Sequence, residues 1–499
     1  MHHRLAFLIA LILGAATLVP HTALAARKAP QRGEAPNVAF DQLLERYYQF
    51  LSKGRLDAAE EIVATIRNTA ADRVVGEALA SMMSSPIAAA RKKDSEARRF
   101  LSNGEAALPN APEILRVILP AYFIVERADF AGLIIDRMIA LAPDVVRELP
   151  TEWVYATLRN SGEPLETVED RRVGLAELGF GGHQGDYMTN AAIGILMKRG
   201  DVARATSLLR YVDAPRAVEN LLIQRRFAPV WPALSQQAGP GLANSREATV
   251  RFALQNYADK SDDSEALADL ISAYRYTSRY SDAIALRNKL PTSAADFAGA
   301  DEQMGWAVNN LALALHSSGQ AEEADRLFAS LNEALPANTW RVSMFINRVE
   351  LLVQDGKFKA AIPLIATAEK EPKSPYAEQL LRRLRYCALS RLNRQPEAAA
   401  LRPMVIAHAK DAVGPTIDGF VCTGELDEAE RLALQHLNDA DFQEDFVRSL
   451  QRSPLTADDP SVWGRWTTLR QRPAIAAAFD RLGRDLPEKL RQEGTGKVQ

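Results

Sequence analysis

The sequence predicts an all-α protein, an α-solenoid of stacked helical hairpins. Three observations lead to this prediction. Short runs of apolar residues recur at helical spacing along most of the chain. A glycine or asparagine falls between consecutive runs, and a small residue recurs at one place in the second run of each pair. Sustained period-2 alternation with β-branched residues, which would indicate a sheet, does not occur.

The clearest copy of the pattern is residues 305–336. Its first apolar run ends at Gly319, which supplies the positive φ of a helix C-terminal cap without strain. A second run follows with Ala324 and Phe328 on one face, and Pro336 ends it. This stretch resembles the tetratricopeptide repeat, a helical hairpin of about 34 residues. The resemblance implies a right-handed superhelix in which each hairpin packs on its neighbours.

The first 25 residues have the pattern of a cleaved secretory signal. A short basic start precedes an apolar run of about 15 residues, which is too short to span a membrane. A small-x-small site at 23–25 follows it, and residues 26–37 are a polar, proline-containing lead-in that we expect to be flexible. No later segment is long and apolar enough to cross a membrane. The signal and the resemblance together indicate a protein of the bacterial periplasm.

The repeated small residue sets the register of the units. It falls at Ala59, Ala97, Leu133, Ala205, Ala283, Ala324, Ala361, Ala398 and Ala429. The turn residue recurs in step at Gly54, Gly200, Gly319, Gly356, Asn393 and Gly424, with Ser278 as a weaker match. We expect N-terminal repeats over 38–260, degenerate near 145–185 and 215–262. Clear repeats with a capping hairpin then cover 261–485, and 486–499 form a frayed tail.

Composition and motifs exclude several classes of function. The chain is 47% hydrophobic and 25% charged with a formal net charge of −3, which matches neither a nucleic-acid binder nor a polybasic membrane surface. No histidine pairs with another histidine or a cysteine at metal-ligand spacing, and no phosphate-binding or nucleophile-elbow motif occurs. We therefore predict no catalytic residues, no metal and no cofactor.

The two cysteines, Cys387 and Cys422, lie on the first helices of adjacent units. Export to an oxidising compartment makes them candidates for a disulfide. In the register of the repeat, however, they fall about one helical turn apart, which favours two separate buried thiols.

The tetratricopeptide resemblance also implies a binding groove lined by the first helix of each unit. The positions that face this groove in the family correspond to Tyr187, Asn190, Arg275, Tyr276, Trp306, Asn309, His316, Arg383 and Arg391. The Lys/Asn set that clamps a peptide carboxylate in some family members is not reproduced, because Leu313 stands where its central Asn should be. Asn310 and Asn347 match a position that is usually structural.

The predicted function is a non-catalytic periplasmic scaffold that binds a protein or an extended peptide in this groove. A role in cell-envelope assembly or polysaccharide export fits the family and the compartment. The alternative is an enzyme or enzyme subunit that acts on peptidoglycan or glycan, with its site in the degenerate region 145–262. A third interpretation is a structural protein that self-assembles through the ends of its array.

Overall fold

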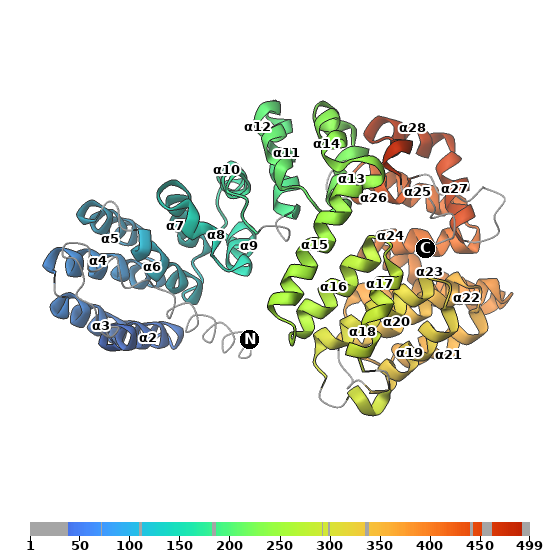
Figure 1. Cartoon of the computed structure of the whole chain (residues 1–499), viewed down its shortest axis with the longest axis horizontal. Coiled ribbons are helices and arrows are strands. Elements are labelled where there is room, and N and C mark those ends of the chain that lie inside the picture. Colours follow the sequence, from blue (N-terminus) through green and yellow to red (C-terminus); the bar gives the residue numbers. More distant parts are fainter. Residues whose placement is uncertain are drawn as a thin grey trace. The chain divides into compact units, whose positions relative to one another are not determined.

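The computed structural model describes residues 38–70, 72–108, 112–181, 186–291, 293–297, 300–334, 339–439, 443–451 and 462–491. In these ranges the secondary structure is helical (Figure 1), and a bridge between Gln224 and Gly483 is the sole β-type pairing. The prediction of an all-α chain is therefore confirmed for the described residues. The signal, the lead-in, Pro336 and residues 492–499 lie outside them. No described helix combines the length and apolar character that a membrane span requires.

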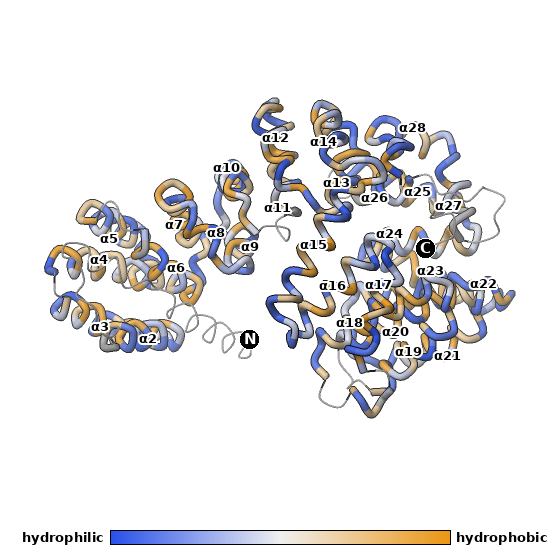
Figure 2. Tube along the Cα trace, in the orientation of Figure 1, coloured by the Kyte–Doolittle hydropathy of each residue, from blue (hydrophilic) through white to orange (hydrophobic). Residues whose placement is uncertain are grey.

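The chain forms two compact units, Met1–Leu196 and Met197–Gln499, which we call unit 1 and unit 2. The division lies within one helix and differs from the boundary at residue 260 that the sequence suggests. In both units hydrophilic and hydrophobic residues alternate along the helices (Figure 2). This alternation is expected of helices that bury one face against a neighbour.

Helices next to one another in the sequence of unit 1 pack together: α2 on α3, α3 on α4, α4 on α5 and α6 on α7. Helix α7 packs both on the short α8 and on α9. The bounds are α2 Val38–Ser52, α3 Leu56–Thr69, α4 Arg73–Ala90, α5 Asp94–Ala107, α6 Pro112–Ile124, α7 Ala128–Leu141, α8 Pro143–Arg147, α9 Thr151–Asn160 and α10 Leu165–Glu177. Helix α11, Asp186–Lys198, spans the division between the units.

Unit 2 continues the pattern, and its longer helices also pack on the helix two elements away, as α16 does on α18 and α22 on α24. Its α-helices are α12 Val202–Leu208, α13 Pro215–Ile223, α14 Trp231–Ala238, α15 Ala243–Asp259, α16 Ser264–Tyr276, α17 Tyr280–Ala285, α18 Glu302–Ser317, α19 Ala321–Ala334, α20 Thr339–Gln354, α21 Phe358–Ala368, α22 Pro375–Arg391, α23 Gln395–Ala407, α24 Val413–Thr423, α25 Leu426–Leu437, α26 Gln443–Ser449, α27 Val462–Gln471 and α28 Pro473–Leu482. Its 3-10 segments are η2 Leu209–Tyr211, η3 Arg225–Val230, η4 Pro240–Leu242, η5 Leu286–Lys289, η6 Ala294–Phe297, η7 Ala409–Asp411 and η8 Glu488–Leu490.

One type of turn joins the helix pairs. At the reference turn Gly319 has a φ of +89°, and the N–H of Gln320 donates to the carbonyl of Leu315 at 2.9 Å. This arrangement satisfies carbonyls that the end of a helix leaves without partners. Every turn residue that the sequence identifies has a positive φ. Lys92 and Glu126 adopt the same conformation, with φ of 60° and 57°.

The small residue of the second helix is buried, as its proposed packing role requires. All eight alanines assigned to this position are 0–3% exposed. The N–H of each donates to the carbonyl four residues earlier, as Ala324 does to Gln320 at 3.0 Å. The assignment to Leu133 is wrong, because in α7 the same bond is made by Ala131, to Arg127 at 3.0 Å. Leu133 is only partly buried, since its side chain is too large for the closest point of helix packing.

The two degenerate segments differ from each other. The described part of the first segment, residues 145–181, contains the pair α9 and α10, with Gly162 at a φ of +65° in the connection. Residues 215–262 are less regular, because the 3-10 segments η3 and η4 interrupt the α-helices. A hairpin of the regular type is therefore absent from this second segment.

Residues 484–490 pack on the irregular segment 215–262. The backbone N–H of Arg484 donates to the carbonyl of Ile223 at 2.8 Å, and its Nε donates to the carbonyl of Leu222 at 2.7 Å. The Arg484 guanidinium lies 3.3 Å from the centroid of the Trp231 ring. Consequently α26 and α28 lie beside the α13–α14 segment (Figure 1), and unit 2 closes on itself. Leu490 is buried, so the predicted frayed tail is wrong for residues 486–491.

Replacing Arg484 with alanine is expected to loosen this closure. The variant loses a charged hydrogen bond to a carbonyl and a cation–π contact, together about 2 kcal/mol. Hydrogen exchange should become faster in residues 215–242 and in α28. Arg481→Ala is the matched control, because Arg481 is exposed and its side chain binds no described residue other than Asn438. Unchanged exchange in residues 215–242 of Arg484→Ala would contradict the closure.

Candidate binding groove

Three first helices of unit 2, α16, α18 and α20, carry the candidate site. The carboxylate of Asp263 accepts the N–H of Glu265 at 2.8 Å and caps α16. The carboxylate of Asp301 caps α18 by accepting the N–H of Met304 at 2.8 Å. Ser264 Oγ donates to Asp301 at 2.6 Å and joins the starts of the two helices. This hydrogen bond, with that of Met304, lowers the pKa of Asp301. The caps define where α16 and α18 begin and therefore which residues face the groove.

A groove with a volume of about 410 Å³ lies across these helices. Four residues that the sequence analysis assigned to a groove line it: Arg275, Tyr276, Trp306 and Asn309. The other lining residues are Ala268, Asp269, Ser272, Gln303, Asn310, Leu313 and Asn347. The surface is therefore mostly polar, with two aromatic side chains.

Helical periodicity explains why polar residues gather here. Asp269, Ser272 and Tyr276 are spaced i, i+3 and i+7 on α16, so they share one face. On α18, Gln303, Trp306 and Asn310 have the same spacing. The opposite faces of both helices are apolar and buried in the core of unit 2. Core packing thus orients the polar stripes toward the groove.

The floor of the groove is an amide pair. Asn309 is only 2% exposed, and its Oδ1 accepts a hydrogen bond from Asn347 Nδ2 at 2.8 Å. One turn earlier, a Cβ on Gly305 would lie 2.5 Å from the ring of Trp340. Only glycine therefore lets α18 approach α20 closely at this point, and the approach brings Asn309 and Asn347 into contact.

At one side of the groove, two guanidinium groups flank one aromatic ring. Tyr276 is 48% exposed. The Cζ of Arg275 lies 4.0 Å from its ring centroid, and the Cζ of Arg216, on α13, lies 5.4 Å from it. No carboxylate in the described ranges forms an ion pair with either guanidinium. The Nε of Arg275 is buried without a hydrogen-bond partner among the described residues.

Two further groups in the groove have hydrogen-bonding capacity that folding does not use. The side-chain amides of Gln303 and Asn310 make no hydrogen bond to another described residue, and both are only partly exposed. Trp306 donates from Nε1 to Glu302 at 3.2 Å, and its ring lines the groove. The groove thus presents donors, acceptors and an aromatic face to whatever enters it.

The remaining predicted groove residues do not line this cavity. His316 binds Asp355 at 2.9 Å near the end of α18. Arg391 is exposed at the end of α22, where its Cζ lies 5.7 Å from the centroid of the Phe358 ring. Tyr187, an exposed residue, and Asn190 lie on α11.

Placing Arg383 on an open groove surface was wrong. Its side chain is only 12% exposed and forms an ion pair with Glu350 of α20. A Cβ on Gly419 of α24 would lie 3.2 Å from the Cβ of Arg383, so the two helices enclose it. Burial lowers the pKa of Arg383, and the charge of Asp418 opposes this shift. Because α20 and α24 pack on either side of α22, this position faces a helix interface.

The two cysteines are joined by a disulfide, with Cα atoms 5.6 Å apart. The interpretation of Cys387 and Cys422 as two separate thiols was wrong. The physical reason is the close approach of α22 and α24 at Gly419, which brings the cysteine positions within bonding distance. Both cysteines are buried.

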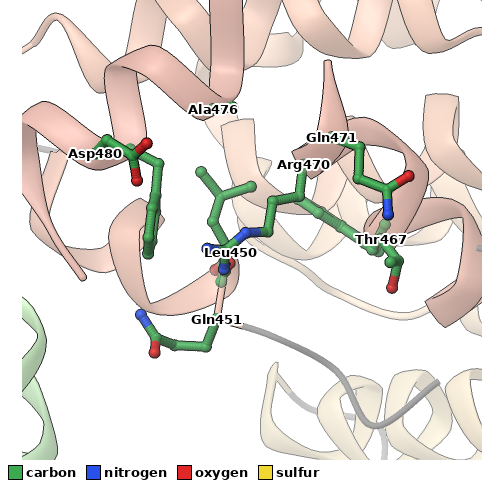
Figure 3. A pocket seen from close by; sticks show the side chains of 10 residues that line it. Leu450, Gln451, Thr467, Arg470, Gln471, Ala476 and Asp480 are labelled. Atoms are coloured by element: carbon green, nitrogen blue, oxygen red, sulfur yellow. The ribbon is translucent and has the colours of Figure 1, made fainter. Parts of the chain in front are cut away.

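A second cavity, of about 570 Å³, lies among α26, α27 and α28 (Figure 3). Its principal polar side chains already have partners within the chain. Arg470 makes a two-pronged ion pair with Asp485 at 2.8 and 3.1 Å. Gln451 donates to the carbonyl of Arg484 at 3.1 Å and accepts the N–H of Leu486 at 2.8 Å. These contacts hold the closing segment in place, so the cavity is a weaker candidate for a ligand site.

The described lining of the groove contains few ionisable side chains. Among the described residues, Asp269 is the one carboxylate that lines it, and burial together with the charges of Glu265 and Asp263 raises its pKa. No histidine or cysteine lines the groove. In the described ranges, no three His, Cys, Asp or Glu side chains are arranged to hold a metal ion.

Several residues that line the groove were not predicted from the sequence to do so. Asn310 and Asn347 were expected to be structural. Asn310 instead lines the groove, whereas Asn347 lines the groove and also has a structural role, because it donates a hydrogen bond to Asn309. The i, i+3, i+7 polar stripes of α16 and α18 were a visible signal for Ser272 and Gln303. Arg216, which contacts the ring of Tyr276 without lining the cavity, had no such signal, because it lies in the irregular segment 215–262.

No protein-family model matches this sequence, and no curated protein matches it either.

Proposed function

We propose that the chain is a non-catalytic binding protein whose groove on α16, α18 and α20 holds an extended segment of another protein. One observation carries the proposal: the groove gathers the side-chain amides of Gln303 and Asn310, which have no hydrogen-bond partner in the described chain, beside two aromatic rings. Unsatisfied polar groups are costly unless water or a ligand completes them. An extended peptide offers regularly spaced N–H and C=O groups that do so.

The size of the groove suits a short peptide. Packed helices lie 8–10 Å apart, so three first helices in a row span about 20 Å. An extended chain rises about 3.3 Å per residue, which corresponds to about six residues. Side-chain amides can contact its backbone groups, and Trp306 and Tyr276 provide surfaces for its side chains.

We propose further that both units belong to a tetratricopeptide-like solenoid that is exported to the periplasm. The repeated positive-φ turn and the buried alanines support the repeat. The signal-like residues 1–25 support export, and the disulfide fits an oxidising compartment. A role in cell-envelope assembly or polysaccharide export is consistent with this location.

A random octapeptide library displayed on phage, panned against the purified protein, tests the binding function. Selected peptides, resynthesised, should bind the wild-type protein. Trp306→Ala combined with Asn310→Ala should weaken their binding at least tenfold, because it removes an aromatic contact and an amide contact. Tyr376→Ala is the matched control, since Tyr376 is exposed on α22 outside the groove.

Photocrosslinking locates the peptides independently. A photoreactive residue at position 276 should crosslink to a selected peptide, whereas the same residue at position 376 should not. Crosslinking at both positions, or undiminished binding to the double variant, would contradict the assignment of the groove.

A further inference from the structure

We infer that the segment bound in the groove is acidic, and that Arg275 and Arg216 anchor one of its carboxylates beside Tyr276. This inference rests on the proposed function and adds the chemical class of the ligand. Its basis is the juxtaposition of two guanidinium groups without an ion-pair partner in the described chain. Arg275 lines the 410 Å³ groove, and the Cζ of Arg216 lies 5.4 Å from the ring centroid of Tyr276, which also lines it.

Tyr276 holds the two cations where a ligand can reach them. Stacking of a guanidinium on an aromatic face limits its freedom, so less entropy is lost when it binds an anion. Arg275 is partly exposed, and Arg216 is exposed. A carboxylate accepts two parallel hydrogen bonds from one guanidinium, and this geometry is stronger than contact with a neutral group.

Several other arginines of unit 2 are paired with carboxylates. Arg348 binds Asp325 through two hydrogen bonds, and Arg385 binds Glu369. Arg402 binds Glu425 in the same way as these surface pairs. Arg275 and Arg216 form no such pair in the described chain, although Arg216 lies close enough to act on Glu219: burial raises the pKa of Glu219, and the charge of Arg216 opposes this rise. Arg391 also lacks an ion pair among the described residues, but Arg275 and Arg216 lie beside Tyr276, which lines the groove.

Asp269 gives the bound segment a direction. It lies seven residues before Tyr276 on the same face of α16, which corresponds to about 10 Å along the helix. An acidic residue is attracted at the Arg275 end and repelled at the Asp269 end. We therefore expect a peptide with acidic residues at one end and neutral residues at the other.

The same charge arrangement favours a peptide over an anionic polysaccharide. A polyuronate carries a carboxylate on every sugar, so a chain that filled the groove would place negative charge beside Asp269 as well. A peptide can carry its charge at one end only. Its backbone also matches the amides of Gln303 and Asn310, which no described side chain satisfies.

Titration calorimetry with the full chain tests the inference. The probe is an acetylated and amidated octapeptide with two glutamates at one end and neutral residues elsewhere. The comparison peptide has glutamine at both acidic positions. The acidic peptide should bind about tenfold more tightly, the effect of one charge-assisted contact. Its advantage should disappear in Arg216→Gln and Arg275→Gln and persist in Arg391→Gln.

The possible outcomes separate the inference from the proposed function. Equal binding of both peptides that Trp306→Ala weakens would overturn the inference and leave the groove function intact. Failure of both peptides and of the library to bind would overturn both. Tighter binding of an oligogalacturonate than of the acidic peptide would replace the peptide with a glycan. Circular dichroism checks folding, and Arg216→Gln provides a surface variant should Arg275→Gln unfold.

Discussion

Replacing Arg171 with methionine is expected to lower the free energy of unfolding of unit 1 by about 3 kcal/mol. The Arg171 side chain is completely buried between α7 and α10, where it binds Asp136 at 2.7 and 2.8 Å and Glu163 at 2.7 and 3.0 Å. Methionine leaves both carboxylates without their cation. This loss of unfolding free energy is at the low end of the range for a broken buried ion pair, because Asp136 is partly exposed and its carboxylate can be rehydrated.

Urea unfolding with hydrogen exchange resolved to α7 and α10 measures this loss. Arg172→Met is the matched control, because Arg172 is the next residue and has no hydrogen bond or ion pair to another described residue. Gly132→Ala should act on the same site, since its Cβ would lie 2.5 Å from the guanidinium of Arg171. Similar, small losses for Arg171→Met and Arg172→Met would show that the buried ion pairs contribute little.

Breaking the Cys387–Cys422 disulfide is expected to destabilise unit 2 by about 4 kcal/mol. The bond closes a loop with a sequence separation of 35 residues, and the chain-entropy relation gives this magnitude for such a loop. Denaturant unfolding with and without a reductant measures the change. Faster hydrogen exchange under reducing conditions should be centred on α22 and α24.

A variant with alanine at both cysteine positions serves as the control for this experiment. It should resemble the reduced wild-type protein and should not respond to the reductant. Two free thiols in the denatured, unreduced wild-type protein, detected by mass spectrometry, would contradict the bond.

The helical repeat could be predicted from the sequence because each unit carries its own local signals. Glycine and asparagine marked the positive-φ turns, and buried alanines marked where helices cross. The turns at Lys92 and Glu126 were not predicted, because neither residue type favours a positive φ. In α7 the bulky Leu133 was mistaken for the small position that Ala131 occupies.

The site was only partly predictable, because exposure depends on neighbouring helices. Arg275, Tyr276, Trp306 and Asn309 could be assigned from their places on the first helices. Arg383 occupies a similar place, but α24 covers it, and a single unit's sequence does not reveal that neighbour. The contact of Arg484 with residues 222–231 was unpredictable for the same reason, since no local pattern encodes a partner more than 250 residues away.

The way in which residues 484–490 pack on residues 222–242 has a consequence for how unit 2 melts. In a linear array of repeats, the outermost modules have a neighbour on one side only and open first. Here residues 484–490 pack on residues 222–242, so the last helices of unit 2 are not a free terminus from which fraying can start. These helices can open only when that contact breaks, which couples the stability of residues 215–242 to that of helices more than two hundred residues later.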